Sequence, residues 1–132
     1  MTALQPQRRR TMSNADTITR FIAAWERLDI DGILSFFAEG ATYHNVPMAP
    51  LVGHGPIRGF VAQFLGGAVS AAFEVRNSAE TAQGVVLNER IDRFVMKDGR
   101  QLAIPVMGVF ELADGKITAW RDYFDMKAIS PA

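Results

Sequence analysis

The chain has 132 residues, of which 48% are hydrophobic and 21% are charged, a combination that fits one compact domain with a substantial core and argues against disorder. Its 14 basic and 14 acidic residues balance, so no basic face for nucleic acid is indicated, and the lack of cysteine excludes disulfides, thiol catalysis and cysteine-based metal sites. The presence of only two histidines disfavours a zinc enzyme, and no apolar run approaches the roughly 20 residues that cross a bilayer.

The N-terminal segment contains Arg8, Arg9 and Arg10, but no apolar stretch follows them, so an export signal is not indicated. We interpret residues 1–12 as a flexible tail, with a basic arm for nucleic acid as the alternative, and residues 13–132 as a single domain. Together these features predict a cytoplasmic protein that binds neither nucleic acid nor membrane.

The first predicted element is a helix that begins near Ser13. This serine lies three residues before Asp16, a relative of the capping box. Hydrophobic residues then recur at helical spacing, which predicts an apolar stripe that packs on a sheet. The stripe consists of Ile18, Phe21, Ile22, Trp25 and Leu28.

The next segments alternate between helix and strand. A short helix is expected over residues 31–37, with Gly40 ending it, and a strand over residues 41–46. The prolines and glycine of residues 47–53 predict a loop. A third helix is expected over residues 56–65, since proline is well tolerated in the first turn.

Strands dominate the second half of the chain. Asp98-Gly99 and Asp114-Gly115 separate the last three of them, and Asp-Gly is a strong hairpin signal. Helices followed by an antiparallel meander predict an α+β domain. The expected strands cover residues 72–76, 84–96, 101–112 and 117–126.

The longest strands are apolar on both faces. In the last strand, simple alternation places Ile117 and Tyr123 opposite Trp120 and Phe124. A sheet with one solvated face should alternate between apolar and polar residues, so both faces of this one should be covered. We expect helices on one face and a second subunit on the other, which predicts a homodimer. The dimer face would carry Leu87, Ile91, Val109 and Tyr123.

Polar residues suited to acid–base chemistry lie among these apolar strand positions. Arg90 and Asp92 share one face of their strand, and Tyr43 and Asn45 share one face of theirs, because strand side chains alternate. Asp122 lies between aromatic residues of the last strand. Taken singly, each motif is more typical of a surface ion pair or a structural contact. Together they hint at buried charge, which is costly unless it is paired.

Two carboxylates with an arginine between them fit the opening of an epoxide. The strained oxygen must gain a proton while water loses one, so an acid and a base are needed on opposite sides of the substrate. Two carboxylates can divide these roles if their environments differ, and an arginine can fix their geometry. Tyrosine and asparagine both donate and accept hydrogen bonds, so they can hold the water.

Several segments resemble the limonene-1,2-epoxide hydrolase family. They are Tyr43-His44-Asn45, Glu89-Arg90-Ile91-Asp92, and Trp120 to Asp125 with the sequence WRDYFD. Gly108-Val109-Phe110 and Gly115 to Thr118 are similar to the last hairpin of that family. The resemblance extends from the first helix to about Asp125, and its motifs are specific in combination although none is specific alone.

The resemblance implies a curved antiparallel or mixed sheet packed against N-terminal helices in a cone, the nuclear transport factor 2-like or cystatin-like roll. It also implies a homodimer that hydrolyses a small apolar epoxide with water and without metal or cofactor. By position, Asp92 would be the general acid and Asp122 the general base, bridged by Arg90, while Tyr43 and Asn45 would hold the water. The expected pocket wall consists of Phe94, Ile104, Val106, Trp120 and Phe124.

Two other functions remain open because fold does not fix function. One is an isomerase or cyclase of the ketosteroid isomerase or polyketide cyclase type, and the other is a non-catalytic small-molecule-binding module. The first needs one carboxylate base, and the second needs no pair of buried aspartates around an arginine. Contact of Arg90 with both Asp92 and Asp122 at a cavity would favour the hydrolase. His44 and His54 are interpreted as structural residues.

Overall fold

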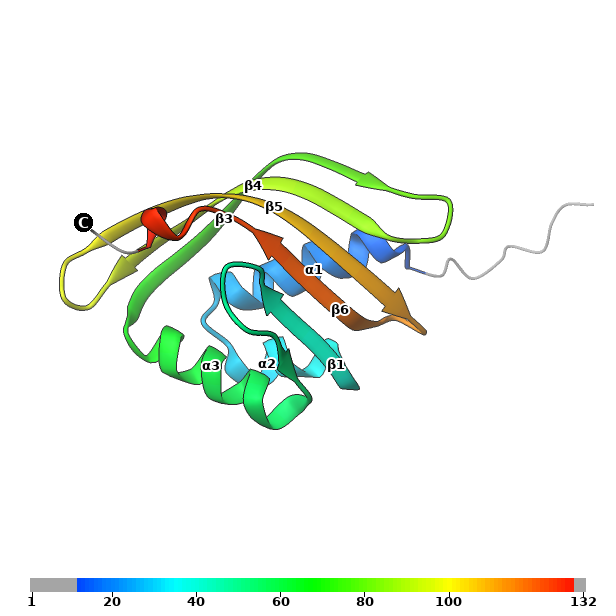
Figure 1. Cartoon of the computed structure of the whole chain (residues 1–132), viewed down its shortest axis with the longest axis horizontal. Helices are drawn as coiled ribbons and strands as arrows, with labels where there is room; N and C mark the ends of the chain where they lie inside the picture. The colour runs from blue at the N-terminus through cyan, green and yellow to red at the C-terminus, as the bar shows by residue number, and fades with distance from the viewer. Residues whose placement is uncertain (1–11, 130–132) are drawn as a thin grey trace, which may run out of the picture.

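The computed structural model describes residues 12–129, so the predicted tail of residues 1–12 lies outside the described part except for Met12. A single six-stranded sheet curves over the helices, all of which lie on one side of it (Figure 1). The elements are α1 (Asn14–Glu26), α2 (Ile30–Ser35), β1 (Phe37–Asn45), β2 (Leu51–Val52), α3 (His54–Gly66), β3 (Ala68–Glu80), β4 (Val86–Met96), β5 (Gln101–Ala113), β6 (Lys116–Tyr123) and a final 3-10 turn, η1 (Met126–Ala128).

The strands follow the order β2-β1-β6-β5-β4-β3. The last four strands form the expected antiparallel meander, whereas β1 pairs with β6 in parallel, so the sheet is mixed. Gly99 and Gly115, in the two Asp-Gly turns, adopt φ angles of 94° and 75°, the left-handed region that glycine enters without strain. The predicted α+β fold with a curved mixed sheet is confirmed.

Helix α1 forms as its sequence predicts. The Ser13 hydroxyl accepts a hydrogen bond from the backbone N–H of Asp16 at 3.0 Å and so caps the helix. Phe21 is fully buried, and its ring packs edge-on against that of Trp120 with centroids 5.1 Å apart. Burying one such side chain contributes about 1.5–3 kcal/mol. The buried side chains of this stripe therefore hold α1 against the inner face of the sheet.

The prediction that the second helix runs over residues 31–37 and ends at Gly40 is wrong. Helix α2 ends at Ser35, and both Phe37 and Gly40 belong to β1. The backbone N–H of Ile117 donates to the carbonyl of Phe36 at 2.8 Å, which starts the pairing of β1 with β6. Pairing with a distant strand has overridden the local helical pattern.

The prediction that Ile117 and Trp120 face opposite sides is also wrong, since both are buried on the inner face. The register between β5 and β6 slips so that Thr118 is an extra residue between two paired positions, a β-bulge. The Thr118 hydroxyl donates to the carbonyl of Glu111 at 3.1 Å. Beyond the bulge, alternation resumes and places Trp120 and Asp122 inward.

Other boundaries differ in extent. Strand β3 is longer than expected because it pairs with β4 along its whole length. Strand β6 ends at Tyr123, and Met126 belongs to η1. Within residues 12–129, no helix is long and apolar enough to cross a membrane. The outer sheet face carries Leu87, Ile91 and Val109 half-buried and Tyr123 exposed.

Candidate active site

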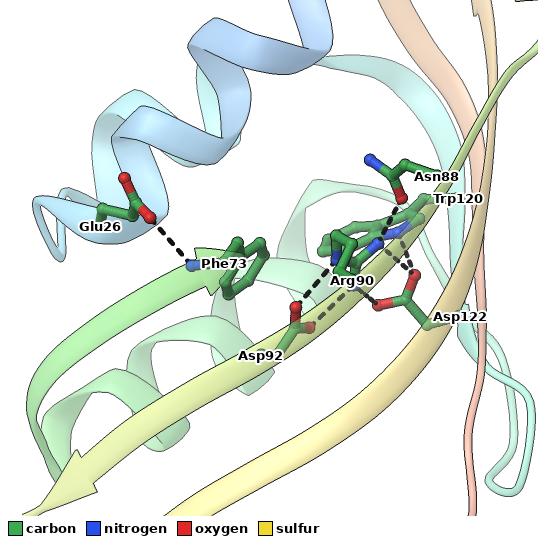
Figure 2. A network of polar contacts seen from close by, with 7 residues as sticks. All are labelled: Glu26, Phe73, Asn88, Arg90, Asp92, Trp120 and Asp122. Atoms are coloured by element: carbon green, nitrogen blue, oxygen red, sulfur yellow. Dashed lines mark hydrogen bonds and ion pairs between the residues drawn. The ribbon is translucent and has the colours of Figure 1, made fainter. Parts of the chain in front are cut away.

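Arg90 lies at the centre of a buried polar cluster on β4 (Figure 2). Its Nε and Nη2 donate to Oδ1 and Oδ2 of Asp92 at 2.9 and 2.8 Å. Its Nη1 and Nη2 donate to Oδ1 and Oδ2 of Asp122 at 3.3 and 2.8 Å. The remaining Nη1 hydrogen bond goes to Oδ1 of Asn88 at 2.9 Å. All five N–H groups of the guanidinium therefore have an acceptor.

Strand alternation explains how the cluster assembles. Asn88, Arg90 and Asp92 occupy successive inward positions of β4, and each is nearly fully buried. Asp122 comes from β6, on the far side of β5, so the guanidinium spans the intervening strand. The predicted contact of Arg90 with both carboxylates is present.

Aromatic rings enclose the guanidinium. The Cζ atom of Arg90 lies 5.1 Å from the ring centre of Phe73 and 6.0 Å from that of Phe110. The backbone N–H of Phe73 donates to Oε2 of Glu26 at 2.9 Å, which ties this part of β3 to α1 (Figure 2). Arginine is weakly hydrated and stacks well on rings, so it is suited to a buried position of this kind.

The protonation of Arg90 is secured by its partners. Burial by itself would lower the pKa of the guanidinium, but the charges of Asp122 and Asp92 and their hydrogen bonds outweigh burial and raise it. The group therefore stays cationic. Removing one partner from a buried ion pair costs about 3–5 kcal/mol, so the three charges depend on one another.

The two carboxylates have different surroundings. Burial raises the pKa of Asp92, the hydrogen bonds and charge of Arg90 lower it, and the negative charge of Asp122 raises it, so that the net shift is above the ordinary value. Asp122 instead accepts three hydrogen bonds, two from Arg90 and one of 2.6 Å from the indole Nε1 of Trp120. Three donors, two of them charged, suit an ionised carboxylate.

Both carboxylates open onto an apolar cavity with a volume of about 70 Å³. Since about 10–15 Å³ is enough for one water molecule, the cavity has room for more than one water. The lining includes Asp92, Asp122, Tyr43 and Asn45, whereas Arg90 lies behind the carboxylates and does not line it. All five residues expected in the pocket wall line the cavity: Phe94, Ile104, Val106, Trp120 and Phe124. The other lining residues are Trp25, Met48, Phe60, Phe64, Phe73 and Ile129.

Tyr43 and Asn45 reach the cavity from β1. In the parallel pairing of β1 with β6, Tyr43 lies opposite Trp120 and Asn45 lies opposite Asp122. The Tyr43 ring stacks on the Trp120 indole with centroids 4.2 Å apart and an angle of 5° between the planes. Burial, followed by the nearby charge of Asp122, raises the pKa of Tyr43, so its phenol remains a hydrogen-bond donor.

Several contributors to the site were missed at the level of sequence. Asn88 could have been found, because it shares the alternation that pairs Arg90 with Asp92. Phe73 lies on another strand, and no sequence signal links it to the arginine. Two buried side-chain nitrogens among the described residues have no protein partner, Nδ2 of Asn88 and Nε1 of Trp25.

Each of the two histidines contacts a backbone carbonyl through its ring. Their Nε2 atoms lie 2.9 Å from backbone carbonyls, that of Met48 for His44 and that of Phe37 for His54. Neither residue lines the cavity. Over residues 12–129, no group of three or more His, Asp or Glu side chains is arranged to hold a metal ion.

Comparison with protein families gives a match over nearly the whole chain. The model of the limonene-1,2-epoxide hydrolase catalytic domain matches residues 12–131. Among characterised proteins, the epoxide hydrolase EphG of Mycobacterium tuberculosis is 32% identical over 127 residues, which span 96% of this chain and 83% of that protein.

Solved structures agree on the fold. An epoxide hydrolase from M. tuberculosis, described as similar to limonene-1,2-epoxide hydrolase, superposes with a TM-score of 0.76 at 25% identity, covering 87% of this chain and 84% of that one. A protein from Shewanella denitrificans that is described as a SnoaL-like polyketide cyclase gives a TM-score of 0.80 at 12% identity, covering 88% and 93% of the two chains. At that identity the second likeness concerns the fold alone.

Proposed function

Because this chain belongs to the limonene-1,2-epoxide hydrolase family, we propose that it adds water to an epoxide and releases a vicinal diol. The observation that carries the proposal is the contact of one buried arginine with two carboxylates that both face an apolar cavity. An apolar cavity with a few convergent polar groups is typical of a small-molecule site.

The proposed reaction takes place in a single step. Asp122 removes a proton from a water molecule held by Tyr43 and Asn45, and the water oxygen forms a bond to one epoxide carbon. The bond from that carbon to the epoxide oxygen breaks, and Asp92 gives its proton to the oxygen. The products are the diol, an ionised Asp92 and a protonated Asp122, and a return of the proton to Asp92 restores the starting state.

The environments of the two carboxylates support this division of roles. The raised pKa of Asp92 favours the carboxylic acid that must donate a proton. The three hydrogen bonds to Asp122 favour the carboxylate that must accept one. Arg90 holds both groups at fixed positions through its planar fork of donors, so no reorganisation is needed during the reaction.

The competing functions fit the cluster less well. An isomerase or cyclase needs one carboxylate base and an oxyanion-stabilising donor, and an arginine held between two carboxylates leaves its donors occupied. A binding module has no use for a second buried carboxylate, since buried charge lowers stability unless it is fully compensated. The hydrolase gives both aspartates and the arginine between them a role.

We also propose the molecular context of this activity. Residues 13–132 form one domain, and the protein is cytoplasmic. The half-buried apolar face of β4 and β5 that includes Ile91 and Val109 packs against a second copy to form a homodimer. The substrate is a small apolar epoxide, because the cavity wall is mainly aromatic and aliphatic.

The direct test is incubation of the purified protein with a panel of cyclic and aryl-alkyl epoxides, followed by mass-spectrometric detection of diols. We expect at least one epoxide to be hydrolysed, and the Asp92→Asn and Asp122→Asn variants to be slower by about 10²–10⁴-fold with the fold retained. Asp98→Asn, in the exposed β4–β5 turn, is the matched control and should retain full activity. The proposal would be refuted if no epoxide of the panel gave a diol. It would also be refuted if Asp92→Asn or Asp122→Asn kept full activity.

A further inference from the structure

One position in β5 breaks the pattern of its neighbours. The inward positions of this strand carry Ile104, Val106 and Phe110, and between them lies Gly108, which is also buried. Glycine in a strand interior is unfavourable, because it adds no packing and loses more chain entropy than other residues. A buried glycine in the middle of the central meander therefore calls for a specific reason.

The backbone does not supply that reason. Gly53, Gly84, Gly99 and Gly115 have the positive φ angles that favour glycine, but Gly108 is not among these residues and lies in regular antiparallel pairing. Its pairing partners are Asn88 on β4 and Asp122 on β6. An alanine could adopt this backbone conformation, so the constraint must come from the space around the residue.

That space is filled by the polar cluster. A Cβ atom at position 108 would overlap Nη1 of Arg90, and it would lie 2.9 Å from both Oδ1 of Asn88 and Oδ1 of Asp122. Contacts of this kind are closer than real Cβ atoms make, so at least one partner must move. The atom overlapped most closely belongs to the group that joins the two carboxylates.

We propose that Gly108 is a positioning residue, whose missing side chain opens the gap through which Arg90 crosses β5 to reach Asp122. The guanidinium starts on β4 and binds a carboxylate on β6, so it must pass over the inner face of the strand between them. Any side chain at position 108 fills that passage. The structural part of this proposal is independent of the reaction, and its catalytic consequence rests on the proposed epoxide hydrolysis.

The test is Gly108→Ala, with Gly40→Ala as the matched control. Gly40 is a strand glycine in β1 whose added Cβ would meet no atom within 4 Å. A displacement of about 1 Å in a catalytic group can cost about 10²-fold in rate. We expect Gly108→Ala to lower kcat by about that factor with much less effect on KM, because Gly108 does not line the cavity. Gly40→Ala should retain the wild-type values.

A second readout does not depend on activity. The chain has two tryptophans, so proton NMR gives two indole N–H signals, which Trp25→Phe assigns. Trp120 donates to the Asp122 oxygen that the new Cβ would crowd. Gly108→Ala should shift the Trp120 signal, and Gly40→Ala should not. If the wild type forms no diol, the proposed function fails, and this shift alone decides the structural claim.

Some results would overturn the proposal. The proposal is wrong if Gly108→Ala folds and its Trp120 indole N–H signal is not shifted. It is also wrong if that signal is shifted but the kcat of an active Gly108→Ala enzyme is unchanged. If Gly108→Ala does not fold, the substitution is repeated in a background of Asn88→Ala, Arg90→Met, Asp92→Asn and Asp122→Ala, which is first shown to fold and which removes all three atoms that the new Cβ would crowd. We expect it to fold there with little change in Tm. Failure to fold in that background as well would show that the glycine serves the strand and not the arginine.

Discussion

The indole Nε1 of Trp120 donates a hydrogen bond of 2.6 Å to Oδ1 of Asp122, two residues further along β6. The same indole stacks on the Tyr43 ring on one side of the site and meets the core ring of Phe21 edge-on. The carboxylate is therefore fixed by a side chain that is itself anchored in the core. Trp120 was expected in the pocket wall, and the structure gives it a polar role in addition.

Trp120→Phe separates these two roles, since it keeps an aromatic ring and removes the donor. A hydrogen bond to a charged group contributes about 1.5–3 kcal/mol, so we expect that loss in the free energy of unfolding and a clear drop in kcat. Trp25→Phe is the control for stability, because Nε1 of Trp25 has no protein partner, and its kcat is not compared because Trp25 lines the cavity. Urea unfolding and steady-state kinetics measure both effects. Equal losses of stability in the two variants, or an unchanged kcat in Trp120→Phe, would contradict a specific role for the Trp120 donor.

The raised pKa of Asp92 predicts how the rate depends on pH. Only the protonated carboxyl can donate to the epoxide oxygen, so kcat should fall as pH rises through the pKa of Asp92. Because burial raises that pKa, the midpoint should lie above the ordinary aspartate value of 3.8. A pH–rate profile measures it. A fall in kcat centred at or below the ordinary value would contradict the assignment of Asp92 as the acid.

The raised pKa of Asp92 also makes the stability of the protein depend on pH. The folded state holds the Asp92 proton more tightly than the unfolded state, so this contribution to stability is complete below the unfolded pKa. It is lost as pH rises through the higher folded pKa. Asp92→Asn cannot titrate, so urea unfolding across this window should show less loss of stability with rising pH than the wild type does.

The predictable part of the fold and site follows from alternation. Arg90 with Asp92 and Tyr43 with Asn45 could be placed on common faces because each pair lies two residues apart on one strand. The hairpins at Gly99 and Gly115 could be placed from turn chemistry. These patterns are local, and they were sufficient to predict that most of the site residues share one face of the sheet.

The parts that could not be predicted depend on contacts between distant segments. Phe37 becomes a strand residue because it pairs with β6, and Ile117 turns inward because of a bulge whose partner lies on β5. Phe73 approaches Arg90 only through the pairing of β3 with β4. The crowding around Gly108 appears only when three strands are aligned. No single segment carries this information.

Arg90→Lys tests whether the planar fork is needed. A lysine ammonium has three donors at a single point and cannot hold both carboxylates and Asn88 together. We expect a loss of about 3–5 kcal/mol in the free energy of unfolding, as for a broken buried ion pair, and severe loss of activity. Arg93→Lys on the outer face of β4, in a half-exposed pair with Glu74, is the control. Comparable stability in the two variants would contradict the bridging role.

The outer face of the sheet predicts the state of assembly. Tyr123 is 47% exposed there, beside the half-buried apolar residues of β4 and β5. We expect light scattering at micromolar concentration to report twice the chain mass, and Tyr123→Glu to shift the protein toward the monomer because it places charge in the interface. Gln63→Glu, at an exposed position of α3, adds the same charge away from this face and is the control. A wild-type protein that remains monomeric would contradict the proposed dimer.

The most direct test of the proposed mechanism follows the oxygen atom of the attacking water. Direct attack by water and attack by an aspartate, which forms an ester that water then cleaves, give the same diol but place the new oxygen differently. A single turnover in ¹⁸O-labelled water, with enzyme in excess over epoxide, separates them by mass spectrometry. We predict that the diol of the first turnover carries the label and that no aspartate does. An unlabelled first diol, with the label recovered in Asp92 or Asp122, would contradict the one-step mechanism.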